Sequence, residues 1–508
     1  MALARAYAVG LVGLAGQVVE VEADIAAGLP TLAVIGLPDA ALAESRDRLR
    51  AAVVNSGQEW PNRRMTLALS PASVPKRGSG FDLAMAAAVL AANGVLPKDE
   101  LRHRVLIGEL GLDGRVRGVP GVLPGVLAAV AEGFARVVVP LANLAEAELV
   151  PGAVARGVGT LRDLVALLTG EPYDETPPAA LTCVPVGRAP DLVDVAGQVT
   201  GRTAVEVAAA GGHHALLLGP PGSGKTMLAE RLPGILPPLS QHEALEVTAI
   251  HSVSGALPPG APLVSIPPFQ EPHHSATVAS IVGGGSGIAR PGAASLAHRG
   301  VLFLDEAPEF AKGVLDALRQ PLEKGRVSIT RVGGTAVYPA AFRLLLAANY
   351  CPCARIDDCI CRPDTRRQYL NKLSGPLLDR VDMHVEVPRI TRAEMLAENG
   401  RGEPSADIAA RVLEARARAA RRYAGTPWAC NGDVPPLELL RSWPLPRSVT
   451  APADRAMDVH VLTARSYGRV VRLAWTLADL EGAARPDTGH VAHALGWRLG
   501  RERWATAA

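Results

Sequence analysis

Residues 215–226 read ALLLGPPGSGKT, and this stretch decides the fold of the middle of the chain. Four apolar residues, 215–218, predict a buried strand, and the helix formers at 227–230 predict a helix after the glycine-rich turn. The turn fills every position of the phosphate-loop pattern G-x-x-x-x-G-K-[ST] in the strand–loop–helix context that this pattern requires. Its residues are Gly219, Pro220, Pro221, Gly222, Ser223, Gly224, Lys225 and Thr226.

The phosphate loop predicts that the protein binds ATP with Mg²⁺. Glycines let backbone N–H groups crowd around phosphate oxygens. Lys225 is expected to reach the β- and γ-phosphates, and the Thr226 hydroxyl is expected to bind Mg²⁺. The alternative, a glycine-rich turn that binds nothing, is disfavoured because every position of the pattern is filled.

A second strand, at residues 301–306 (VLFLDE), predicts the hydrolytic half of the site. Its four apolar residues suit a central parallel strand that is buried on both faces. We expect Asp305 to hold Mg²⁺ through water and Glu306 to polarise the attacking water, so that the protein is an ATP hydrolase. A strand that merely ends in two acidic residues is the alternative.

Composition limits the remaining classes of protein and of binding partner. A chain of 508 residues should hold about three domains. Its 52 basic and 50 acidic residues predict no partner from overall charge, and the 4% aromatic content argues against base stacking as the main mode of binding. No apolar window of about eighteen residues predicts a membrane span, and the first residues lead into a strand-like alternation without a cleavage site. We therefore expect a cytoplasmic protein with no membrane partner.

Pattern changes along the chain divide it into four segments. We expect a first α/β domain at residues 1–170, a linker rich in Pro and Thr at 171–190, and an ATPase domain at 191–390. The alternating strands and helices of the ATPase domain predict a doubly wound parallel sheet with ATP at its carboxyl edge. Residues 391–508 read as helical, interrupted by a stretch rich in Pro and Trp at 425–452.

Several strings resemble the ComM/YifB family of magnesium-chelatase-like AAA+ ATPases, and the resemblance extends over nearly the whole chain. They are IGLPDA (35–40), LSPA (69–72), KRGSGFDL (76–83), IGELGLDG (107–114), PHHSA (272–276), GGG (283–285), SLAH (295–298) and LSGPLLDR (373–380). The resemblance implies a Lon-protease-like first domain without proteolysis, an AAA+ ATPase domain and a C-terminal helical lid. The chain departs from the family pattern at Gln270, Glu271 and Ala293, which lie outside the ATPase core.

The resemblance also implies roles for three polar side chains. Asn349 ends the apolar strand 344–349 and resembles the sensor of the γ-phosphate, although a turn asparagine is the alternative. Arg380 resembles the arginine finger that reaches a neighbour's ATP, and the resemblance implies a ring, a hexamer in this family. The alternative is a surface arginine paired with Asp379 or Asp382. Arg465 resembles the second sensor arginine of the lid, and Arg472 on the same helical face stays open as the alternative.

Cys351, Cys353, Cys359 and Cys361 form the pattern C-x-C-x5-C-x-C directly after Asn349. Four of the six cysteines within eleven residues indicate a metal site rather than a disulfide framework, and four thiolates could bind Zn²⁺. A reduced cluster that only packs is the alternative.

Residues 326–331 and 336–338 flank Gly333-Gly334, which predicts a hairpin. By resemblance this hairpin points into a central pore, where Arg331 would contact DNA phosphates; a solvated hairpin is the alternative. The adjacent His273 and His274 point in different directions on a regular element, so we expect conformational or intersubunit roles rather than joint metal ligation. A basic helix is expected to present a solvated lid face. Its arginines are Arg411, Arg416, Arg418, Arg421 and Arg422.

Three functions compete. The resemblance implies a DNA motor that migrates branch points when incoming DNA recombines in natural transformation. The alternative is the ATPase subunit of a magnesium or other metal chelatase, or another protein-remodelling ATPase. A protease is disfavoured, because Ser79 stands in a GSGF string and no matching lysine is evident.

Overall fold

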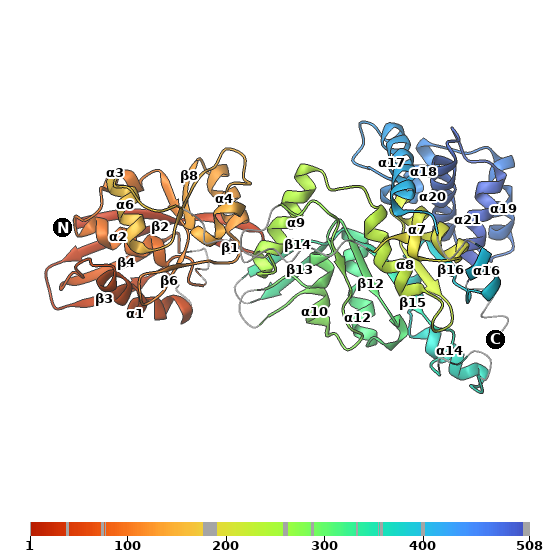
Figure 1. Ribbon diagram of the computed structural model, residues 1–508, viewed down its shortest axis with the longest axis horizontal. Helices are drawn as coiled ribbons and strands as arrows, with labels where there is room; N and C mark the ends of the chain where they lie inside the picture. The colour runs from red at the N-terminus through yellow and green to blue at the C-terminus, as the bar shows by residue number, and fades with distance from the viewer. Residues whose placement is uncertain are drawn as a thin grey trace.

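The computed structural model describes residues 2–36, 40–72, 76, 78–175, 190–257, 263–285, 289–331, 334–353, 355, 359–397 and 402–500. A first α/β domain, a second α/β domain and a group of helices follow one another along the longest axis of the molecule (Figure 1). Within these ranges no helix has the length and apolar character needed to cross a membrane.

The first domain is built on a seven-stranded mixed sheet with the order β3-β4-β2-β1-β5-β8-β9. Every second residue of β2 from Val19 to Ile25 is buried, because one face of the sheet packs on helices. The strands are β1 (Ala2–Val12), β2 (Ala15–Ala26), β3 (Thr31–Ile35), β4 (Arg64–Ser70), β5 (Arg104–Leu106), β6 (Glu109–Leu110), β7 (Val116–Arg117), β8 (Arg136–Pro140) and β9 (Val154–Val158). The helices are α1 (Ala40–Asn55), α2 (Asp82–Ala92), α3 (Lys98–Leu101), α4 (Val122–Ala131), α5 (Leu144–Ala147) and α6 (Leu161–Thr169).

The second domain contains a five-stranded sheet with the order β11-β12-β15-β10-β16, and each neighbouring pair is parallel. This confirms the predicted doubly wound sheet. Its strands are β10 (Ala215–Leu218), β11 (Phe269–Gln270), β12 (Val301–Leu304), β15 (Arg343–Ala348) and β16 (Met383–Glu386). Alternate side chains of β10 enter two different cores, one on each face, which explains why the strand is apolar throughout.

Helices cover both faces of this sheet, and a two-stranded hairpin leaves it. The helices are α7 (Val199–Gly211), α8 (Lys225–Arg231), α9 (Gln241–Ser254), α10 (Val278–Val282), α11 (Ala293–Leu296), α12 (Lys312–Ala317), α13 (Arg319–Lys324), α14 (Pro363–Asn371) and α15 (Gly375–Leu378). The predicted hairpin is present as β13 (Arg326–Arg331) and β14 (Gly334–Pro339), although Gly333 lies outside the described residues.

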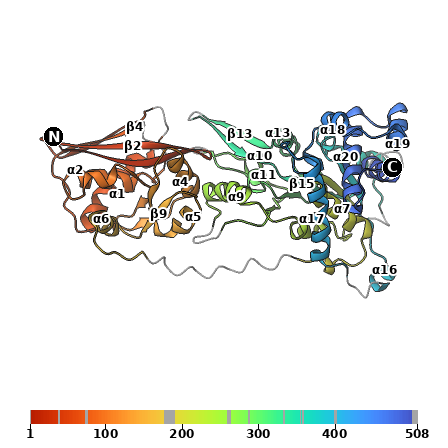
Figure 2. The ribbon, with the colours of Figure 1, turned by 90° about the horizontal axis from the view of Figure 1, so that it is seen from above.

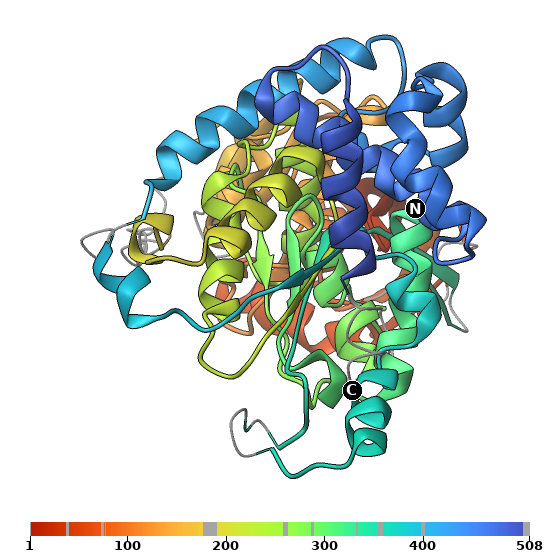
Figure 3. The same ribbon diagram turned by 90° about the vertical axis from the view of Figure 1, so that its right-hand side faces the viewer.

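The C-terminal region is helical, as expected, and Figure 3 looks onto this end of the molecule. Its helices are α16 (Arg392–Ala397), α17 (Ser405–Arg422), α18 (Pro436–Ser442), α19 (Arg447–Asp458), α20 (Ala464–Glu481) and α21 (Thr488–Leu499). The stretch 425–452 is less of an interruption than its prolines suggested. Pro436 is the first residue of α18, a position where its missing N–H is tolerated. Pro452 lies inside α19 and has no N–H to donate to the Ser448 carbonyl. That carbonyl instead accepts a hydrogen bond from the Thr488 hydroxyl at 3.3 Å.

The basic helix α17 is not the solvated face that its charge suggested. Arg411 donates to Glu206 at 2.7 Å, and Arg416 donates to the carbonyl of Ala209 at 2.9 Å. Both partners belong to α7, so these arginines fasten the C-terminal helices to the ATPase domain.

The first domain also contacts the second directly. The tip of the β1–β2 hairpin comes so close to β14 that a Cβ on Gly13 would lie 3.3 Å from the Val337 carbonyl oxygen. The N–H of Gly121, before α4, donates to the carbonyl of Ser252 in α9 at 3.1 Å. Figure 2 shows the two hairpins approaching each other at this junction.

Candidate nucleotide site and its surroundings

The phosphate loop leaves β10 at the carboxyl edge of the sheet and enters α8 at Lys225. A Cβ on Gly219 would lie 2.1 Å from the Val387 carbonyl oxygen, so only glycine lets the chain pass here. Gly224 has φ of 86°, in the left-handed region that favours glycine. The sequence therefore folds this loop by local backbone requirements.

The buried amine of Lys225 donates hydrogen bonds to three oxygens. Its Nζ donates to the carbonyls of Gly219 at 2.9 Å and Pro220 at 2.8 Å, and to Oδ1 of Asn349 at 3.1 Å. Burial lowers the pKa of Lys225, and the negative charges of Asp305 and Glu306 oppose that shift. Asn349 follows β15, the neighbour of β10, so parallel pairing brings the amide to the loop. An ammonium that is fixed in this way is suited to phosphate oxygens.

Oxygen ligands for Mg²⁺ meet next to the loop. The Thr226 hydroxyl donates to Oδ2 of Asp305 at 2.7 Å, across the gap between α8 and the end of β12. The Glu306 N–H donates to the other Asp305 oxygen at 2.8 Å, and Glu306 has φ of 49°, which is uncommon outside glycine. The Glu306 side chain is 53% exposed and so accessible to water. Hydroxyl and carboxylate oxygens are the donor set that Mg²⁺ takes with nucleotide phosphates, so these residues fit the ion.

The segment after β11 lies over the acidic residues. Nδ1 of His274 is 3.9 Å from Oε2 of Glu306, and the rings of His273 and His274 have centroids 4.0 Å apart with their planes tilted by 35°. Gln270 is part of β11 and Glu271 follows it, so these two departures from the family pattern do not lie outside the ATPase core as expected. Burial, with the negative charges of Asp305 and Glu230, raises the pKa of Glu271. His274 therefore lies near Glu306, the carboxylate that we expect to activate water. The sequence did not reveal this proximity.

Gln198 is a second residue that sequence reasoning missed. Its Nε2 donates to the carbonyl of Ser223 in the phosphate loop at 2.7 Å and to that of Pro388 at 2.6 Å, and the residue has φ of 49°. Its Oε1 is buried without a hydrogen-bond partner among the described residues. A Gly197-Gln198 pair before an alanine-rich helix was the visible signal, but nothing in it pointed to the loop.

Arg380 and Arg465 lie at the opposite edge of the sheet. Met383 of β16 pairs with Ala215 of β10, so Arg380 precedes the amino end of the strand, at least about 13 Å from the phosphate-loop edge. Nη1 of Arg465 lies 2.7 Å from Oδ2 of Asp379, next to Arg380 in the chain. Neither arginine is therefore placed to reach its own phosphate loop.

The partners of these arginines differ from the alternatives left open by the sequence. Arg380 pairs with Glu323, and not with Asp379 or Asp382. Burial and the nearby positive charges of Arg319, Arg465 and Arg469 lower its pKa. Arg465 is 61% exposed, whereas Arg472 is 8% exposed and lies among the buried residues in the middle of α20. Of the two candidate lid arginines, Arg465 is thus the one that is open to a ligand.

The four clustered cysteines lie together. The sulfurs of Cys351, Cys353 and Cys359 are 3.4 Å apart pairwise, and one ligand atom from each of these residues and Cys361 fits within 4.8 Å. All four are free thiols. Tetrahedral coordination with Zn–S bonds of about 2.3 Å would place the sulfurs roughly 3.8 Å apart. The described cluster fits Zn²⁺.

Two further predicted sites have these positions. Arg331 ends β13, is exposed, and donates through Nε to the carbonyl of Gly285 at 3.3 Å. Ser79 donates to a carboxylate oxygen of Glu109, whereas the amine of Lys76 donates to the carbonyl of Pro71. The serine hydroxyl thus contacts an acid and not the amine that a serine–lysine catalytic pair requires.

Three segments of the chain match families that are described as parts of magnesium chelatase. Residues 21–143 match "Subunit ChlI of Mg-chelatase", residues 191–395 match "Magnesium chelatase, subunit ChlI", and residues 402–498 match the C-terminal family of the same subunit.

Relatives match over the whole length. An uncharacterized protein of Mycobacterium tuberculosis, Rv2897c, is 52% identical over 508 residues, which cover 98% of this chain and 99% of that protein. The uncharacterized protein YifB of Salmonella typhimurium is 39% identical, with 98% and 97% covered. The competence protein ComM of Haemophilus influenzae is 38% identical, with 98% of each chain covered.

Proposed function

Because this chain belongs to the ComM/YifB family of magnesium-chelatase-like AAA+ ATPases, we propose that it is an ATPase that forms a hexameric ring and couples ATP hydrolysis to movement along DNA. In this proposal it migrates branch points during recombination of incoming DNA in natural transformation. The proposal of a ring rests on one observation: the predicted site residues lie at two opposite edges of the five-stranded sheet. Phosphate-binding residues lie at the carboxyl edge and arginines at the amino edge, which supports a ring in which a second copy supplies the arginines.

Each residue then has a role in hydrolysis. Lys225 binds the β- and γ-phosphates, and Thr226 with Asp305 holds Mg²⁺, which neutralises phosphate charge when it is bound. Glu306 orients and polarises the attacking water, and Asn349 senses the γ-phosphate from the side where it already contacts Lys225. Residues Arg380 and Arg465 act on the ATP of the neighbouring copy.

The remaining assignments belong to the same proposal. We divide the chain into an N-terminal domain at 1–170, a linker at 171–190, the ATPase domain at 191–390 and the lid at 391–508. Zn²⁺ bound by the four clustered thiolates would fix the loop that follows Asn349, because metal ligation closes an otherwise irregular segment.

DNA is the proposed partner because of the β13–β14 hairpin. A ring with the arginine edge against the next phosphate loop would repeat this hairpin around its axis. Arg331 near the tip would meet backbone phosphates, so binding should be insensitive to base sequence and should weaken as salt rises. The Haemophilus relative is named a competence protein, which supports uptake of DNA as the setting.

A metal-chelatase ATPase subunit is the second candidate, since all three matched families are described as parts of that enzyme. In that case the ATPase would remodel a protein partner instead of translocating DNA. The full-length match to ComM favours the DNA motor.

The deciding experiment is ATPase activity with and without four-way-junction DNA, together with a junction-migration assay. We expect stimulation and migration by the wild type, and loss of both with basal activity retained in Arg331→Glu. Arg326→Glu, an exposed arginine at the other end of the same strand, is the matched control. If DNA neither stimulates the wild type nor is moved, while a chelatase-type partner protein stimulates hydrolysis, the chelatase candidate replaces the motor.

A further inference from the structure

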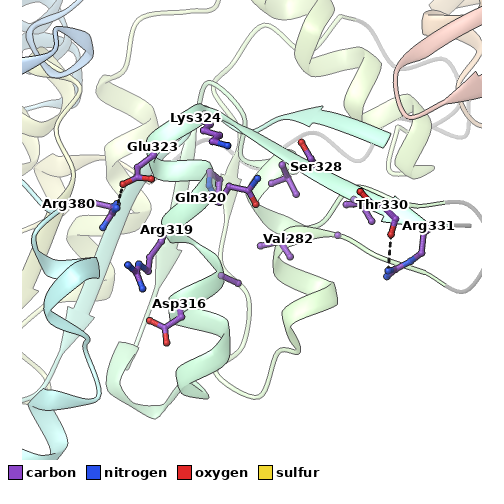
Figure 4. A pocket seen from close by; sticks show the side chains of 15 residues that line it. Val282, Asp316, Arg319, Gln320, Glu323, Lys324, Ser328, Thr330, Arg331 and Arg380 are labelled. Carbon is purple, nitrogen blue, oxygen red and sulfur yellow. Dashed lines mark hydrogen bonds and ion pairs between the residues drawn. The ribbon is translucent and has the colours of Figure 1, made fainter. Parts of the chain in front are cut away.

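A cavity of about 660 Å³ opens beside Arg380 (Figure 4). It lies between the end of α10, helices α12 and α13, strand β13 and the turn before β16. Four basic side chains and two acidic ones line it, an excess of two positive charges. They are Arg319, Lys324, Arg331 and Arg380, with Asp316 and Glu323.

The charges inside the cavity are unevenly paired. Arg380 is 11% exposed and is neutralised by Glu323, which is 54% exposed and could turn to solvent. Asp316 accepts the Ser374 hydroxyl at 3.2 Å. Arg319 is exposed, and in the part of the chain that the structure describes it has no carboxylate partner. Figure 4 shows its side chain directed to the same region as Arg380.

Two neighbouring guanidinium groups, of which only Arg380 has a carboxylate partner among the described residues, are suited to an anion. Guanidinium offers a planar fork of donors that matches phosphate oxygens bidentately, and its charge does not depend on pH in the usual range. A terminal phosphate group offers several oxygens and more than one negative charge, so it can satisfy two arginines where a single carboxylate satisfies one.

We propose that this cavity receives the terminal phosphates of ATP bound by a second copy of the chain, and that Arg319 binds them together with Arg380. Glu323 occupies the place of the phosphates on Arg380 until the two copies meet. This assignment rests on the proposed ring of ATPases, since the cavity lies at the edge of the sheet that is remote from its own phosphate loop.

The position of Arg319 also connects this cavity to the hairpin. Helix α13 carries Arg319 and Glu323, and a single residue, Gly325, joins it to β13 with Arg331 at the far end. Displacement of Glu323 by phosphate therefore acts on the element that we assign to DNA.

The test is basal ATPase activity of the full chain without DNA. Arg319→Ala should lower kcat at least about tenfold while ATP binding stays intact, because transition-state charge loses a donor. Arg319→Lys should restore part of the rate, and Arg326→Ala should leave it unchanged. Mixing Arg319→Ala with Glu306→Gln subunits should restore activity, because one interface then pairs intact Arg319 with intact Glu306.

Glu323→Gln gives an independent measurement. Removing the competing carboxylate should reduce the protein concentration at half-maximal activity by about two- to fivefold, the range of an exposed ion pair.

Three results would overturn the inference. The first is full basal ATPase activity of Arg319→Ala. The second is an Arg319→Ala variant that loses only the stimulation of its ATPase by DNA, which would assign the cavity to nucleic acid. The third is failure of the mixture of Arg319→Ala and Glu306→Gln subunits to regain activity. Full activity of Arg380→Ala would instead refute the proposed ring chemistry on which the inference rests.

Discussion

Replacing Asp382 by Asn removes a buried negative charge that joins the ATPase domain to the lid. Asp382 is 2% exposed; it accepts a hydrogen bond from Arg469 of α20 and another, at 3.1 Å, from the His214 N–H. Arg469 also donates to the Arg380 carbonyl at 3.1 Å. The substitution therefore leaves a nearly buried guanidinium without its counter-charge, beside the proposed arginine finger.

The size of the effect follows from this burial. Breaking a buried ion pair by removing one partner costs about 3–5 kcal/mol. For a folding unit of the size of the ATPase domain and lid, each kcal/mol corresponds to roughly 2–4 °C, so the melting temperature should fall by about 6–20 °C. Asp382→Asn with Arg469→Met should lose much less, because the uncompensated charge is gone.

The effect has a defined dependence on pH. Burial alone would raise the pKa of Asp382, but the charge of Arg469 and the His213 ring, whose Nδ1 lies 3.4 Å from Oδ2, outweigh it and hold the pKa well below the usual value. A carboxylate with a lowered pKa stabilises the fold above its unfolded pKa, about 3.9, and this contribution is lost as pH falls below that value. The difference between wild type and Asp382→Asn should therefore be full at neutral pH and should shrink in acid.

Calorimetric melting at several pH values measures this, with ATPase activity at a temperature below the transition. Glu414→Gln breaks the exposed pair with Arg418 in the same region and should cost at most about 1 kcal/mol. If Asp382→Asn melts no lower than this control at neutral pH, the buried pair does not hold the lid and the reasoning is wrong.

Three further outcomes are expected. Protein purified under reducing conditions without chelator should contain about one zinc per chain by elemental analysis, and Cys353→Ser with Cys359→Ser should abolish it; metal-free wild type would leave only packing for the cluster. His274→Ala should lower kcat by roughly tenfold with unchanged KM for ATP, because Glu306 loses the imidazole that lies 3.9 Å from its carboxylate, and His274→Gln should keep part of the rate; an unchanged kcat in His274→Ala would contradict this role. Gln198→Leu should weaken ATP binding in calorimetric titration, since the phosphate loop loses its support, and unchanged affinity would contradict that role.

Much of the nucleotide site could be anticipated from short strings. The strand–loop–helix at 215–231 is specified locally, because the apolar strand residues, the glycines of the turn and the helix formers all lie within this one short segment. The three apolar strands at 215–218, 301–304 and 344–349 likewise predicted a parallel sheet, and parallel strands bring their carboxyl ends to one edge. Asp305, Glu306 and Asn349 were found on that argument.

Other features had no local signal. Lys225 and Asn349 are 124 residues apart, and Arg380 meets Glu323 across 57 residues. His274 stood in a recognised string, but its approach to Glu306 depends on how β11 pairs with β12. The arginines of α17 looked solvated because charge content alone does not show which backbone carbonyls lie opposite.

The difference between the features that the sequence predicts and those that only the tertiary structure decides has one physical reason. Backbone conformation and hydrophobic period are properties of neighbouring residues, so the chain already prescribes its phosphate loop, its strands and the carboxylates that end them. Ion pairs and cavities depend on which elements pack together, and that is settled by burial summed over the whole domain. The placement of Arg319 and Arg380 in one cavity, on the edge of the sheet remote from Lys225, is such a property, and it exists only once the sheet and its helices have assembled.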